Sequence, residues 1–121
     1  MLDRKIEGNS IIFRNGSATV LTIEENETDN GIVMVLNGEL RSDVAHELLD
    51  ELTALATVGV SIVVDFAGVT YITSTILDVF LSVQQIMDSM HKGSMTLCKM
   101  PGEIFDEFER TGTAELLQIE D

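Results

Sequence analysis

The stretch that decides the fold is IVVDFAGVTYITSTILDVFL, residues 62–81. Its apolar start belongs to a predicted strand over residues 60–64. A short loop over residues 66–71 follows, and three consecutive hydroxyl residues then open a long segment with apolar residues at helical spacing. This order predicts a buried strand, a loop and a helix over residues 74–91. Because the strand is apolar almost throughout, we expect it to be covered on both faces.

The hydroxyl residues Thr73, Ser74 and Thr75 stand where the predicted helix begins. Serine and threonine favour this position because a side-chain oxygen accepts a hydrogen bond from an unpaired backbone N–H. The same N–H groups and the helix dipole favour an anion, so a phosphate is stabilised there. The spacing alone leaves two interpretations open: the hydroxyls only cap the helix, or one of them is modified.

Strands and helices alternate along the rest of the chain. This alternation predicts an α/β domain with a four- or five-stranded mixed sheet and helices mainly on one side. Two polar breaks, EENETDNG at residues 24–31 and Asn37-Gly38, are predicted to be a loop and a strand end. The predicted strands are residues 18–23, 32–36, 60–64, 95–99 and 116–119, and the predicted helices are residues 44–57, 74–91 and 101–110.

Residues 1–17 are the least informative part of the chain. SIIF, residues 10–13, is typical of a short edge strand, and the RNG that follows is a turn signal. We therefore predict an N-terminal extension that is either an added edge strand or mobile. A single domain over residues 18–121 is expected to follow it.

Two tracts resemble the signature of STAS domains, the anti-sigma-factor antagonist family. DFAGVTYITSTILD, residues 65–78, is similar to the family's strand-ending Asp, its S-G-V-T-F-M loop and its D-S-S/T-G-L-G helix start. GELR, residues 38–41, is similar to a family strand that ends G-E-L-D. The resemblance runs from about Ala18 to the C-terminus and implies a STAS-type fold. It also implies phosphorylation, because the family's modified serine aligns with Ser74, with Thr75 as the alternative acceptor.

Four positions depart from the family pattern. Thr73 stands in place of an Asp, Ile76 and Asp78 in place of glycines, and Arg41 in place of an acidic residue. Asp78 lies one helical turn from Ser74, where its charge opposes a phosphate. The family usually has one more helix after the last strand, and we expect it to be missing here. The N-terminal extension, or a second copy of the chain in a homodimer, is then expected to cover the apolar surface left behind.

The predicted helix over residues 74–91 has two unlike faces. At 100° per residue its large apolar side chains gather on one side, which we assign to the core. Ser74, Asp78 and Leu81 lie on the opposite side, and Leu77 lies at its border. The spacing and the resemblance together predict a partner-binding surface made of Glu39, Arg41, Ser42, Thr73, Ser74, Thr75, Leu77, Asp78 and Leu81.

Composition narrows the class of partner. The 121 residues carry a formal net charge of −14, which disfavours nucleic acid and anionic membrane surfaces and permits a basic protein partner. No apolar run approaches the roughly 20 residues of a membrane span, and the N-terminus has no hydrophobic signal region. We therefore expect a cytoplasmic protein without membrane insertion. The single cysteine, Cys98, lies in an apolar run and is expected to be a buried strand thiol.

The chain lacks the residue patterns of an enzyme. Asp65 ends a strand, as in a receiver domain, but the acidic pair that such a site needs to hold Mg²⁺ is missing, so Asp65 is expected to bond loop amides. His46 and His91 stand on separate helices without zinc-ligand spacing. Phosphate-binding glycine loops and hydrolase motifs are absent from the sequence. We therefore expect no catalytic residues, no metal and no cofactor.

The function implied by the resemblance is that of an anti-sigma-factor antagonist. The unphosphorylated protein would bind an anti-sigma factor that is also a Ser/Thr kinase, and would so release a sigma factor. Phosphorylation of Ser74 would reverse this binding, and a phosphatase would reset the switch. The alternative is a STAS scaffold, or a subunit of a larger regulatory or transport assembly, that works without phosphorylation. An enzyme of receiver or hydrolase type is the third and least favoured class.

Overall fold

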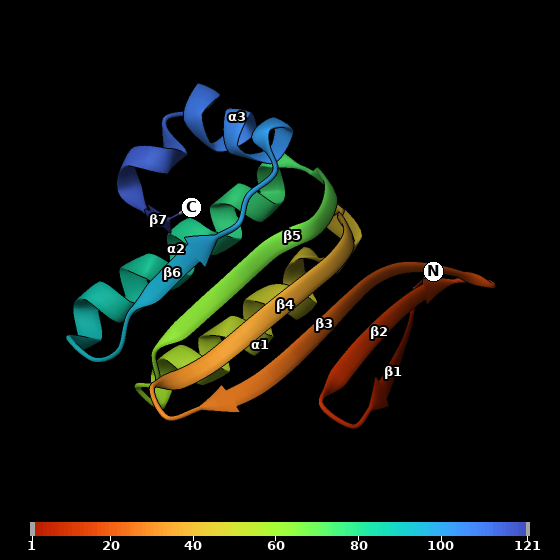
Figure 1. The fold of residues 1–121 in the computed structure, drawn as a ribbon, viewed down its shortest axis with the longest axis horizontal. Helices are drawn as coiled ribbons and strands as arrows, with labels where there is room; N and C mark the ends of the chain where they lie inside the picture. The colour runs from red at the N-terminus through yellow and green to blue at the C-terminus, as the bar shows by residue number, and fades with distance from the viewer. Residues whose placement is uncertain (1, 121) are drawn as a thin grey trace.

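The computed structural model describes residues 2–120 as a mixed seven-stranded sheet with three helices (Figure 1). The prediction of four or five strands was therefore too low. The strands are β1 (Asp3–Glu7), β2 (Ser10–Asn15), β3 (Ala18–Thr28), β4 (Gly31–Leu40), β5 (Ile62–Ile72), β6 (Met95–Cys98) and β7 (Gln118–Glu120). The helices are α1 (Ala45–Thr57), α2 (Ser74–Met90) and α3 (Gly102–Arg110), with 3₁₀ turns η1 (Ser42–Val44) and η2 (Thr113–Leu116).

The sheet follows the chain in order, from β1 at one edge to β7 at the other. Strands β1 to β4 pair antiparallel, whereas β4 to β7 pair parallel and are joined by one helix each. Successive right-handed crossovers in one direction place their helices on one face of the sheet. Figure 1 shows α1 and α2 side by side behind the central strands. The prediction of helices mainly on one side is confirmed.

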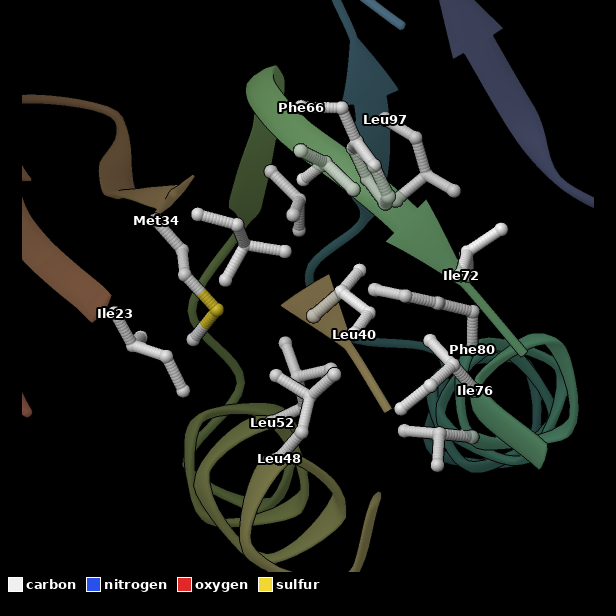
Figure 2. Close-up of a cluster of buried hydrophobic side chains, with 14 of the residues drawn as sticks. Ile23, Met34, Leu40, Leu48, Leu52, Phe66, Ile72, Ile76, Phe80 and Leu97 are labelled. Carbon is white, nitrogen blue, oxygen red and sulfur yellow. The ribbon is translucent and has the colours of Figure 1, made fainter. Parts of the chain in front are cut away.

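The core lies between this helical layer and the sheet (Figure 2). Leu48 and Leu52 of α1 and Ile76 and Phe80 of α2 are fully buried and point at the central strands. Helix α3 joins the same core through Phe108. The Phe108 ring centroid lies 6.0 Å from that of Phe66 on β5 and 6.4 Å from that of Phe80.

Strand β5 is covered on one face only. Ile62, Val64 and Phe66 are buried under the helices, but Val63 between them is 37% exposed. The expectation that both faces would be covered was wrong, because all three helical crossovers lie on one side. An apolar run marks a central strand but does not by itself report a second helical layer.

Strands β4 and β5 run further than the sequence predicts. Residues 66–71 are not a loop but the second half of β5, and Asn37-Gly38 lies inside β4. Two register shifts between these strands accommodate the irregular part. Gly38 has φ +118°, and a Cβ there would lie 2.2 Å from the Val20 carbonyl oxygen. Close approach of strand β3, rather than a turn, explains this glycine.

The N-terminal extension forms the antiparallel hairpin β1–β2 at the β3 edge of the sheet. Ile11 and Phe13 of β2 are buried in the core, so this part of the chain is an added edge rather than a mobile tail. Arg4 of β1 reaches α1, where its Nε and Nη2 atoms lie 3.5 Å from Glu47 and 3.7 Å from Glu51. The hairpin lies at the opposite edge of the sheet from β7, so it does not cover the C-terminal strand.

Three element boundaries also differ from the sequence predictions. Most of the predicted loop at residues 24–31 belongs to β3, and the turn is reduced to Asp29 and Asn30. The predicted last strand at 116–119 is instead the end of η2 followed by β7. Helix α1 begins one residue later than predicted because η1 precedes it. At residues 24–28 the local turn signal yields to strand pairing, which satisfies more backbone groups.

A carboxyl pair lies where β3, α1 and the hairpin meet. Burial, a hydrogen bond that the protonated Glu25 carboxyl donates to Glu51, and the negative charge of Glu51 raise the pKa of Glu25 from 4.5 to about 7. The folded protein therefore holds this proton more tightly than the unfolded chain does. The resulting stabilisation is complete below about pH 4.5 and is lost as the pH rises through about 7.

We expect Glu25→Gln to abolish this contribution, because the amide stays neutral at every pH. The free energy of unfolding of the wild type, relative to that of Glu25→Gln, should fall between pH 4.5 and 7. Urea denaturation of both proteins across this range measures the difference. Glu27→Gln, at an exposed neighbouring carboxylate, is the matched control and should track the wild type. Parallel curves for wild type and Glu25→Gln would contradict the assignment.

Candidate functional site

The candidate site is built by the parallel pairing of β4 and β5 at their C-terminal ends. Leu40 is the register partner of Ile72, and the Thr73 amide donates to the Leu40 carbonyl oxygen at 3.2 Å. The residues that follow each strand are therefore neighbours in space, although 31 positions separate Ser42 from Thr73. Both α1 and α2 start from this edge, so their N-terminal turns lie close together.

A hydroxyl cluster, made of Ser42, Thr73 and Thr75, occupies this edge. The Ser42 hydroxyl donates to Thr73 Oγ1 at 3.4 Å and lies 3.3 Å from Thr75 Oγ1. Thr73 in turn donates weakly to the Leu40 carbonyl oxygen at 3.5 Å. The structure therefore brings together predicted site residues from two distant tracts. Ser74 is exposed and takes part in none of these contacts.

Helix α2 begins without a side-chain cap. Thr73 is its N-cap residue, in an extended conformation, but its hydroxyl makes no capping hydrogen bond. Ser74 is the first helical residue and not the cap. The capping interpretation of the three hydroxyls is thus wrong in detail: Thr73 Oγ1 bonds across to β4 and η1 instead. The hydroxyls of Ser74 and Thr75 are left at the surface of the first turn.

Ser74→Ala should therefore change stability little. Because Ser74 is exposed and caps nothing, we expect its free energy of unfolding to stay within about 0.5 kcal/mol of the wild type. Phe80→Ala, a truncation on the buried face of the same helix, should cost about 3–5 kcal/mol. Chemical denaturation of the three proteins gives both values. A loss of about 1 kcal/mol or more for Ser74→Ala would restore the capping interpretation.

Arg41 lies beside the hydroxyl cluster but is already paired. Its Nη2 atom lies 2.8 Å from Asp43 Oδ2, and Nη1 lies 3.8 Å from Glu39 Oε1. The side chain is about one-third exposed. Arg41 thus forms ion pairs with both Glu39 and Asp43 at the end of β4, and these two carboxylates neutralise its charge. Surface pairs of this kind contribute little to stability.

A groove of about 400 Å³ runs between the first two helices next to the cluster. We call it the α1–α2 groove. From the η1–α1 side it is lined by Ser42, Ala45, His46 and Leu49, and from α2 by Thr75, Asp78, Val79 and Ser82. Thr75 is therefore the one residue of the hydroxyl tract 73–75 that faces the groove. Ser74 lies outside it.

The outer face of α2 matches the predicted stripe in part. Ser74 and Asp78 are exposed and Leu81 is half-buried. Leu77 is only 3% exposed and belongs to the core, so it is removed from the partner-facing set. Its place at the border of the helical wheel did not show that other core residues would cover that side.

Sequence reasoning missed the α1 wall of the groove. None of Ala45, Leu49 and Ser82 was singled out as a site residue from the sequence. Leu49 is half-buried, whereas its neighbour Leu48 is fully buried. The sequence signal for this wall was Leu49, which follows the buried residue Leu48 by one position. That signal indicates a groove only once α2 is known to pack beside α1.

The helical layer is strongly acidic. Helices α1 and α2 contain Glu47, Asp50, Glu51, Asp78 and Asp88 and no lysine or arginine. His46, which lines the groove, lies 3.4 Å from Asp50, and both side chains are well exposed. The surface around the hydroxyl cluster therefore carries a negative potential.

The open face of the sheet carries the remaining chemistry-bearing residues. Asp65 Oδ1 accepts a hydrogen bond from the Ala67 amide at 2.8 Å, as predicted, and its Oδ2 lies 3.6 Å from Lys99 Nζ. Cys98 is half-buried rather than fully buried, and burial raises the pKa of its thiol, which disfavours the reactive thiolate. Within residues 2–120, no group of three or more His, Cys, Asp or Glu residues is arranged to hold a metal ion.

The described part of the chain contains no helix long and apolar enough to cross a membrane.

Comparison with known proteins identifies the family. A family model described as "Mlab, STAS domain" matches residues 23–118. The chain belongs to the STAS domain family. The match covers both tracts that carry the resemblance and starts beyond the hairpin β1–β2. STAS domains of the anti-sigma antagonist type are generally non-catalytic. No curated protein matches the chain.

Solved STAS structures share the fold at low sequence identity. The anti-sigma factor antagonist SpoIIAA in its unphosphorylated form has a TM-score of 0.68 at 13% identity, over 82% of this chain and 88% of that one. A putative antagonist from Thermotoga maritima has a TM-score of 0.70 at 19% identity, over 82% and 86%. An antagonist from Mycobacterium paratuberculosis has a TM-score of 0.67 at 15% identity, over 82% and 84%. At these identities the similarity establishes the fold alone.

Proposed function

We propose that this STAS domain is an anti-sigma-factor antagonist, a cytoplasmic binding module controlled by phosphorylation. The observation that carries the proposal is the hydroxyl tract at the start of α2, which lies at the wall of a groove on an otherwise acidic helical surface. The unphosphorylated protein binds an anti-sigma factor that is also a Ser/Thr kinase and thereby frees a sigma factor. ATP and Mg²⁺ belong to the kinase, and a phosphatase resets the switch.

A phosphate on the hydroxyl tract blocks partner binding because it fills space in the α1–α2 groove. It adds about two negative charges and three oxygens to the groove wall. Asp78 lies in the same wall, no lysine or arginine lines the groove, and Arg41 is engaged by Glu39 and Asp43. No cation of the groove wall therefore compensates the phosphate, which also takes up space that a docked partner would fill.

The groove favours Thr75 over Ser74 as the hydroxyl that acts on binding. The resemblance aligns the modified serine with Ser74 and gives Thr75 as the alternative. Both side chains are exposed, so a kinase has access to either. Thr75 lines the groove and lies 3.3 Å from the Ser42 hydroxyl, whereas Ser74 lies outside. A phosphate on Thr75 therefore intrudes on a docked partner, and one on Ser74 sits at the margin.

The second candidate is a STAS scaffold or assembly subunit that binds its partner without phosphorylation. The altered tract supports it. Ile76, in place of a family glycine, is fully buried, and Asp78, in place of the other, holds a carboxylate one turn from Ser74. Thr73 replaces the acidic residue that usually precedes the serine. A kinase that recognises the family pattern therefore finds different side chains around Ser74 in this chain.

An in vitro kinase assay with the Ser/Thr kinase encoded nearest the gene separates the two candidates. We expect the wild type to take up one phosphate. Thr75→Val should lose it if Thr75 is the acceptor, and Ser74→Ala should lose it if Ser74 is. Intact mass and peptide mass spectrometry read the site directly, and Ser82→Ala is the matched control on the same helix. A wild type that takes up no phosphate but still binds that kinase would support the scaffold instead.

Substitutions on two sides of α2 test which face binds the partner. Leu81→Asp should weaken partner binding with a small loss of stability, because Leu81 is half-buried on the outer face. Leu77→Asp should unfold the protein, because it buries an unpaired charge in the core. Pull-down with the kinase and thermal denaturation measure both effects. Leu81 lies outside the α1–α2 groove, so if Leu81→Asp binds as the wild type does, the outer face of α2 beside Leu81 takes no part in docking.

A further inference from the structure

The α1–α2 groove has a shape that accommodates one more helix. Its lining residues repeat at helical spacing on both walls, as Ser42, Ala45 and Leu49 on one side and Thr75, Val79 and Ser82 on the other. Each set spans eight residues, and the seven steps between its ends make two turns or roughly 10 Å at the 1.5 Å rise of a helix. Most of these side chains are small, so a third helix can approach to the usual interaxial distance of about 8–10 Å.

The floor of the groove is apolar and its rim is acidic. Ala45 is 7% and Val79 5% exposed, and half-buried Leu49 extends the floor. Asp78 is exposed on the α2 rim, and the Asp50 side chain is 64% exposed on the α1 side. An apolar floor between carboxylates is complementary to a helix with one apolar stripe flanked by cations.

We propose that the α1–α2 groove binds a basic amphipathic helix of the partner protein, with lysine or arginine side chains of that helix facing Asp78 and Asp50. This inference rests on the proposed role of α2 as the partner-binding element. It adds the structural class of the docking segment and its charge. The cation–carboxylate contacts lie at the rim, where they steer association and fix orientation, and the apolar stripe supplies the buried area.

The charge of the helical layer decides between occupants. A second copy of the chain that docked by the same groove would bring exposed Asp50 and Asp78 against the same two carboxylates and be repelled. An anionic membrane is repelled for the same reason. Within residues 2–120 the hairpin β1–β2 leaves the groove open: it contacts α1 through Glu47 and Glu51, neither of which lines the groove.

A phosphate acts differently at the two candidate hydroxyls under this proposal. A phosphate on Thr75 projects into the groove and displaces the partner helix. The cations of the displaced helix then gain no attraction from the added negative charge. A phosphate on Ser74 stays outside, where it adds negative charge beside the rim. Thr75→Glu should therefore weaken binding of a basic helix, and Ser74→Glu should leave it unchanged or strengthen it.

Two synthetic 18-residue amphipathic peptides test the proposal. They share one Leu/Ala stripe and differ only in carrying lysine or glutamate at every polar position. With ¹⁵N-labelled wild type, the lysine peptide should shift the amide resonances of Ala45, Leu49 and Ser82 most, and the glutamate peptide should shift none. The proposal is overturned if the lysine peptide shifts the amide resonances of other acidic segments, such as residues 24–29, as much as those of the groove. It is also overturned if the lysine peptide does not bind.

A charge reversal on α2 gives the second readout. Asp78→Lys should weaken binding of the lysine peptide about tenfold, which corresponds to ~1.4 kcal/mol. Asp88→Lys makes the same charge change outside the groove and should change the affinity less than about twofold. Equal effects of the two variants, binding of phosphatidylglycerol vesicles through the groove amides, or a dimer that masks those amides would each overturn it. The kinase assay does not depend on these peptide-binding measurements. A failure of the proposed phosphorylation switch is therefore distinguished from a failure of helix binding in the α1–α2 groove.

Discussion

The candidate site depends on the parallel pairing of β4 with β5 beyond the regular part of the sheet. Both strands continue through register shifts to Leu40 and Ile72, and the Thr73 amide closes the pair on the Leu40 carbonyl oxygen. Without this continuation the starts of η1 and α2 would not meet. The Ser42–Thr75 contact, the mouth of the groove and the position of Arg41 all follow from it.

The glycines in this extension have a structural explanation that excludes most other residues. A Cβ on Gly68 would lie 1.8 Å from the Asn37 side-chain oxygen, and one on Gly38 would meet strand β3. Both glycines therefore let strands lie closer together than side chains normally permit. The family signature at these positions records a packing requirement of the sheet, separately from any function of the hydroxyls that follow.

The sequence predicts the helices well because their signal is periodic and local. Helix α2 was placed to within a residue, and its buried and exposed faces were largely assigned. The strands were predicted less well. Asn37-Gly38 carries a strong turn signal that tertiary pairing overrides, and the charged strand β1 has no apolar alternation to reveal it. Leu77 was misassigned because a helical wheel shows direction but not which neighbours cover each side. The groove itself joins α1 and α2 across distant sequence, so it became visible only with the fold.

The hairpin that extends the sheet also determines how its outer edge meets other molecules. Strand β1 leaves one side of its backbone without a partner strand in the described sheet, and its five residues are all exposed. Four of the five are charged: Asp3, Arg4, Lys5 and Glu7. An edge with this composition resists pairing with a strand of another chain, because desolvating its charges opposes the new hydrogen bonds. The other edge, β7, spans three residues and offers little template. The hairpin thus protects the sheet against edge-to-edge aggregation while the helical face stays open for recognition.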